Sequence, residues 1–91
     1  KHLIPLLLLG LLAAPAEAAC YADFKAKRDD PLRLVYGVAQ VSDAACSREA
    51  AQRELAPRLR AQGWSLMTVL SVFGPDGLEA RKADGAELFR N

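Results

Sequence analysis

The sequence predicts a small α+β domain with a βαβ-like core, closed by one disulfide. Two apolar segments, 32–41 and 64–73, are typical of strands, and the segment between them is typical of a helix. A short helix before them and a short strand after them complete the prediction: one short N-terminal helix, one main helix and a sheet of three strands. With 91 residues, the chain has room for one small domain.

The first 18 residues have the pattern of a secretory signal peptide. Lys1 and His2 form a basic start, residues 3–14 are apolar, and small residues precede a predicted cleavage site between Ala18 and Ala19. We therefore expect a mature domain of residues 19–91 that is periplasmic or secreted. The alternative is a retained anchor facing the periplasm, although this apolar segment is shorter than the roughly 20 residues that a membrane span needs.

The two cysteines predict the covalent framework of the mature domain. An even number of cysteines in a short secreted chain indicates a disulfide, here between Cys20 and Cys46. Closing a loop of this length stabilises a domain by about 3.5 kcal/mol in the chain-entropy description. A redox-active pair usually has a Cys-x-x-Cys spacing, so the wide separation favours a structural bond.

The first half of the mature chain predicts a helix, a strand and a second helix. Residues 20–30 predict a short amphipathic helix, because Tyr21 and Phe24 are three residues apart and Asp30-Pro31 ends the segment. Residues 32–41 predict a strand whose two faces are both largely apolar.

The main helix is predicted over 44–62. Ala51, Leu55 and Leu59 recur every four residues as an apolar stripe. Its N-cap is Ser42-Asp43 or Ser47, and Pro57 should kink it.

The second half of the mature chain begins with a helix end. Gly63 suits the left-handed position after the helix, and Trp64 can cover Leu59 there, as in a Schellman motif. Residues 64–73 then predict a strand with Trp64, Leu66, Thr68, Leu70 and Val72 on one face.

A turn at 74–77 leads into an ambiguous segment, 78–85. This segment is a helical turn begun by an Asp76/Glu79 capping box, or a hairpin strand. We prefer the helical turn. Residues 87–90 predict a short edge strand with Leu88 or Phe89 facing inward.

Charge and composition exclude several classes of function. The mature chain keeps a net charge of +1 with both signs interspersed, which argues against nucleic acid or an anionic membrane as the main partner. The one histidine, His2, lies in the leader, so catalysis by Ser-His or Cys-His pairs is excluded. The sequence contains no Gly-rich phosphate loop and no Cys/His spacing typical of a metal site. We expect no catalytic residue, cofactor or metal.

Basic side chains on the two predicted helical segments form the one candidate binding patch. They are Arg48, Arg53, Arg58, Arg60, Arg81 and Lys82. Such a patch suits an acidic partner or a polyanion. The alternative interpretation is the solvated face of a helix, partly neutralised by Glu49 and Glu54.

The stretch from Cys20 to Val38, followed by Cys46 and Gly63-Trp64, resembles small uncharacterised secreted proteins of Gram-negative bacteria. The resemblance implies a periplasmic location and brings no activity, cofactor or functional residue. We expect a non-catalytic interaction or accessory module with an unidentified protein partner. One alternative is a membrane-tethered accessory subunit of a larger complex that retains its leader. The other is a small enzyme that uses carboxylates without histidine.

Overall fold

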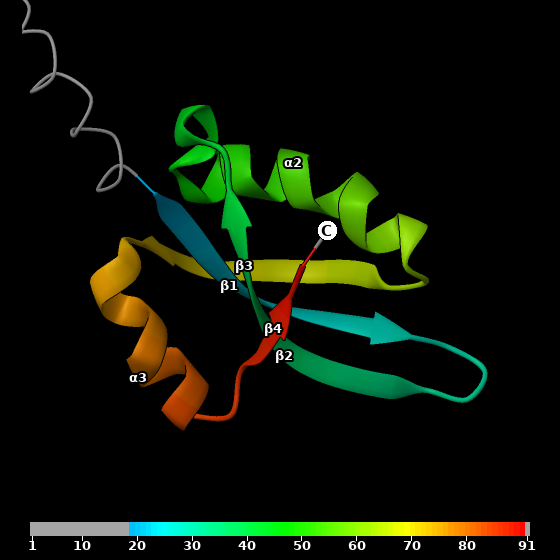
Figure 1. Ribbon diagram of the computed structural model, residues 1–91. Helices are drawn as coiled ribbons and strands as arrows, with labels where there is room; N and C mark the ends of the chain where they lie inside the picture. The colour runs from blue at the N-terminus through cyan, green and yellow to red at the C-terminus, as the bar shows by residue number, and fades with distance from the viewer. Residues whose placement is uncertain (1–18, 91) are drawn as a thin grey trace, which may run out of the picture.

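The computed structural model describes residues 19–90, so the predicted signal peptide lies outside the described residues (Figure 1). The described part is α+β, as predicted, and forms one sheet with helices packed on it. In chain order its elements are β1 (Cys20–Arg28), β2 (Arg33–Val41), the 3-10 turn η2 (Asp43–Ala45), α2 (Arg48–Ala61), β3 (Ser65–Phe73), the 3-10 turn η3 (Pro75–Gly77), α3 (Leu78–Ala83) and β4 (Glu87–Phe89).

The sheet has four strands, not the predicted three. Their order is β3-β1-β2-β4. β1 is antiparallel to both of its neighbours, and β4 is parallel to β2. The strands on either side of α2 therefore run in the same direction, as a βαβ-like core requires, but β1 lies between them.

The predicted helix at 20–30 is wrong, because this segment is the central strand β1. Its buried apolar residues alternate: Cys20, Ala22, Phe24 and Ala26 lie on one face. A period of two is the pattern of a strand. Phe24 is 0% exposed, and the small alanines on either side of it leave space for α2 to approach the sheet. The three-residue spacing of Tyr21 and Phe24 places these aromatic rings on opposite faces.

The main helix starts later than predicted. Residues 43–45 form η2, and α2 begins after Ser47, whose Oγ accepts a hydrogen bond from the Ala50 backbone N–H at 3.2 Å. Ser47 is therefore the N-cap, not Ser42. The predicted stripe of Ala51, Leu55 and Leu59 is buried against the sheet, and α2 continues through Pro57.

The end of α2 confirms the predicted Schellman motif. Gly63 has a φ of +88°, a left-handed conformation that favours glycine. The Gly63 N–H donates to the Arg60 carbonyl at 3.0 Å, and the Trp64 N–H donates to the Leu59 carbonyl at 2.9 Å. This sharp end turns the chain back into β3.

β3 does not alternate as predicted, because its pairing with β1 shifts register twice. Its core-facing residues are Leu66, Val69 and Val72, which pair with Ala26, Phe24 and Ala22. Met67 and Leu70 are the extra residues at the two shifts, and both are exposed. A bulge inserts one residue without a partner and re-aims the side chains beside it. Two bulges therefore change a period of two into a spacing of three.

The C-terminal part confirms the helical turn and the edge strand. Residues 78–83 form α3, but its N-cap is Gly77 and the predicted capping box is absent. Phe89 of β4 faces inward, with its ring centroid 5.3 Å from that of Phe24 and 6.2 Å from that of Trp64. Gly37 makes this packing possible, since a Cβ there would lie 2.7 Å from Phe24 Cζ.

The predicted disulfide is present between Cys20 and Cys46, whose Cα atoms are 5.9 Å apart. It joins the start of β1 to the segment between η2 and α2. A structural disulfide indicates an oxidising, extracytoplasmic compartment. Within residues 19–90, no helix combines the length and hydropathy needed to cross a membrane.

Candidate functional site

The two faces of the sheet are covered to different extents. α2 covers one face, where its buried residues join Phe24 and the alanines of β1 in the core. α3 covers the opposite face only at the end away from the β1–β2 turn (Figure 1). Within residues 19–90, no element covers the half of this opposite face nearer the turn.

A buried carboxylate holds α3 on the sheet. Asp23 is 5% exposed and is the one buried charged residue of the described part. Its Oδ2 accepts from the Tyr36 hydroxyl at 2.8 Å, and its Oδ1 accepts from the Ser71 hydroxyl at 2.7 Å. Arg81 of α3 donates to Ser71 Oγ at 3.0 Å, lies 3.6 Å from Asp23 Oδ2 and stacks 4.0 Å above the Phe73 ring.

This cluster was not anticipated from the sequence. Burial raises the pKa of Tyr36, and the hydrogen bond to Asp23 together with the Asp23 charge raises it further. Both hydroxyls of the cluster donate to the buried carboxylate and Arg81 supplies the opposite charge, as a buried charge requires. An acidic residue between two apolar ones, as in Ala22-Asp23-Phe24, predicts a buried carboxylate only if the segment is known to be a central strand.

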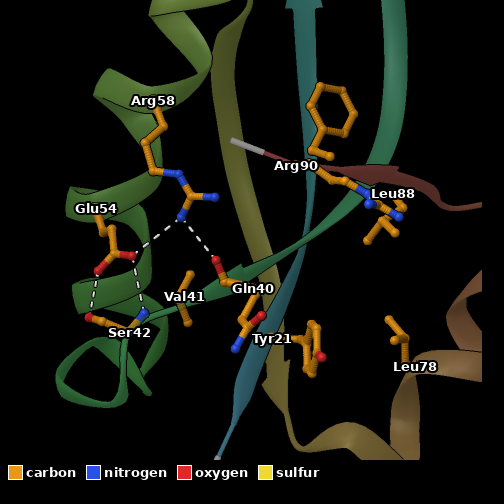
Figure 2. Close-up of a pocket in the computed structure, with 10 residues that line it drawn as sticks. Tyr21, Gln40, Val41, Ser42, Glu54, Arg58, Leu78, Leu88 and Arg90 are labelled. Atoms are coloured by element: carbon orange, nitrogen blue, oxygen red, sulfur yellow. Dashed lines mark hydrogen bonds and ion pairs between the residues drawn. The ribbon is translucent and has the colours of Figure 1, made fainter.

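A groove of about 690 Å³ lies at the end of β2, where β4 stops (Figure 2). α2 forms one wall with Glu54 and Arg58, and Leu78 of α3 stands across the groove. Arg58 donates to the Gln40 carbonyl at 2.9 Å. Glu54 accepts from the Ser42 backbone N–H at 3.1 Å and from its hydroxyl at 2.7 Å.

The groove lies along an edge of the sheet whose backbone groups are already bound by side chains of α2. Beyond Ala39 no strand of the described part pairs with this edge of β2, and backbone groups left without a strand partner there would be a template for another chain. The Glu54–Arg58 ion pair, 3.3 Å long, occupies the Gln40 carbonyl and the Ser42 N–H instead. A ligand strand would have to displace both side chains.

The Glu54 carboxylate should make stability depend on pH. Hydrogen bonds from the Ser42 hydroxyl and backbone N–H, together with Arg58, hold the pKa of Glu54 below its ordinary value near 4.5, although burial opposes them. A lowered pKa in the folded state stabilises the protein above pH 4.5, and this contribution is lost as pH falls through the folded pKa. Glu54→Gln should thus lower the unfolding free energy by about 1 kcal/mol at pH 7 and much less near pH 3.

Urea unfolding between pH 3 and pH 7 measures this difference. Glu87→Gln, which neutralises an exposed glutamate of β4, is the matched control and should stay close to the unaltered protein. A difference for Glu54→Gln that is constant over this range would contradict the assignment.

The predicted basic patch is distributed over several places. Arg58 seals the groove, and Arg48 donates to the Val69 carbonyl of β3 at 3.4 Å. Arg53 and Arg60 are exposed on α2. Arg81 faces the Asp23 cluster on the other side of the sheet, and the exposed Lys82 pairs with Glu79 at 3.6 Å.

The uncovered half of the second sheet face carries exposed apolar side chains. Leu34 of β2 is 67% exposed, and Met67 at a bulge of β3 is 50% exposed. Lys25 of the intervening strand β1 lines the same shallow hollow of about 300 Å³. Lys27, which pairs with Leu34, follows on the same face. We name Lys25, Lys27, Leu34 and Met67 the open face.

Neither a metal cluster nor a relative points to a reaction. Residues 19–90 contain no group of three histidine, cysteine or acidic side chains placed to hold a metal ion. Comparison with protein-family models, curated proteins and solved structures gives no match for this chain. The chemistry of its own surface is therefore the basis for any assignment.

Proposed function

We propose that this chain is a non-catalytic interaction module of the periplasm, and that it binds a protein partner through the open face. The observation that carries the proposal is the exposure of Leu34 and Met67, which line one hollow of the sheet surface together with Lys25. Contiguous apolar patches on soluble domains are commonly interaction sites.

The use of the polar side chains supports a binding role. Asp23, Tyr36, Ser71 and Arg81 satisfy one another and hold α3 in place. Glu54 and Arg58 cover backbone groups of the sheet edge. Each of these two groups of polar side chains stabilises the fold. The side chains of the open face, in contrast, are covered by no other element of residues 19–90. The extracytoplasmic location that the disulfide indicates agrees with a periplasmic module.

Site-specific photo-cross-linking of the full chain in the organism that produces it tests the proposal. A photoreactive amino acid at position 34 should form one dominant adduct with a partner protein. The same group at position 53, exposed on α2, is the matched control and should form none. Met67→Glu should abolish the adduct from position 34, because it places a charge in the apolar contact. Equal adducts from both positions, no adduct, or an adduct that survives Met67→Glu would refute the proposal.

A further inference from the structure

We propose that the segment bound by the open face is an apolar stretch of protein with an acidic side chain at its centre, opposite Lys25. The inference rests on the proposed function and specifies the chemistry of the partner. Its basis is the position of one lysine among the apolar side chains that a partner would cover.

Lys25 stands in the middle of the open face. It is exposed on the central strand, and its cross-strand neighbours are Tyr36 of β2 and Thr68 of β3. Leu34 and Met67 line the same hollow, so a partner that contacts both of them passes over Lys25. Among residues 19–90, Lys25 has no ion-pair partner.

Covering this ammonium group sets a condition on the partner. Removing a charge from water is unfavourable unless an opposite charge and hydrogen bonds replace the solvent. An apolar partner that packs on Leu34 and Met67 alone would leave Lys25 buried and unpaired. A carboxylate at the centre of the partner segment meets the condition, and it adds specificity because other charges are rejected there.

The neighbouring Lys27 adds no second requirement of this kind. It lies two residues after Lys25 on the same face of β1, and its Nζ is 3.8 Å from Asp29 Oδ1 in the β1–β2 turn. Its partner is thus already present, while that of Lys25 is not. The open face consequently requires one further acidic group at its centre.

The charges disfavour two other occupants. A second copy of the chain placed face to face would bring Lys25 and Lys27 of both copies together, and like charges across an interface are unfavourable. An anionic membrane would meet no uniformly basic surface, because exposed Asp29 and Asp30 of the β1–β2 turn lie beside the exposed Arg33. A protein segment with its own acidic residue avoids both conflicts.

Two synthetic peptides test the inference directly. They share alternating leucine and valine with serine and threonine, and they differ only in the central residue, glutamate or lysine. Binding is followed by NMR through the methyl groups of Leu34 and Met67. We expect the glutamate peptide to bind about tenfold more tightly than the lysine peptide, and we expect Lys25→Glu to reverse this preference. Arg53→Glu, an equal charge change at an exposed site on α2, should leave it unchanged.

Several results would overturn the inference. These are equal binding of the two peptides, binding of neither, or a preference that Lys25→Glu does not reverse. Sedimentation of the chain with phosphatidylglycerol vesicles through the open face, or a dimer that Leu34→Ser dissociates, would assign the face to a different occupant. The proposed function and this inference can fail separately. An adduct from position 34 that persists in the Lys25→Glu variant would support the proposed function and contradict the acidic partner. A chain that forms no adduct would contradict both.

Discussion

Phe24→Ala is expected to lower the free energy of unfolding by about 3–5 kcal/mol, which is a large fraction of the stability of a domain of this size. Phe24 is fully buried on the central strand and packs edge-on against Phe89. The substitution leaves a cavity below α2 that the pairing of β1 on both sides keeps from collapsing. Urea unfolding followed by circular dichroism measures the loss.

Tyr21→Ala is the matched control for this prediction. Tyr21 is three residues away on the same strand, but it lies half-buried on the opposite sheet face, where it stacks on Phe73. Its truncation should destabilise the domain by less than half as much. Comparable losses at Tyr21 and Phe24 would fit an amphipathic helix at 20–30 and would contradict a central strand.

Replacing both Cys20 and Cys46 by serine should lower stability by about 3.5 kcal/mol, the chain-entropy value for this loop. For a domain of this size each kcal/mol corresponds to about 4–8 °C, so Tm should fall by roughly 14–28 °C. The disulfide anchors the start of the central strand to the chain that leads into α2, so its loss affects both sides of the core. Calorimetry of the double variant measures the shift.

The unaltered protein treated with a phosphine reductant is the internal control. It should unfold at nearly the same temperature as the double variant, because both lack only the cross-link. A reduced protein that keeps its Tm would show that the disulfide does not contribute to stability.

Features that depend on residues close in sequence were predictable. The Schellman end at Gly63 and Trp64 needs only a glycine after the last helical turn and an apolar residue behind it. The buried stripe of α2 follows from the four-residue spacing of Ala51, Leu55 and Leu59. The disulfide followed from the number of cysteines in a short chain with a predicted secretory leader.

Features that depend on distant segments were not predictable. Ala22 and Ala26 suit a helix or a strand, and only pairing with β2 and β3 makes 20–28 the central strand. The outward direction of Met67 is set by a register shift in that pairing. The open face could not be predicted for the same reason. No pattern of neighbouring residues shows which half of a sheet face remains uncovered.

By itself the sequence determined the α+β class, the main helix with its C-terminal end, and the disulfide, since local spacing and chain chemistry are sufficient for each. The tertiary structure alone decided the four-strand order, the burial of Asp23 and the open face. The physical reason lies in α3. Held at one end of the sheet through Arg81 and only six residues long, it leaves Lys25, Leu34 and Met67 exposed.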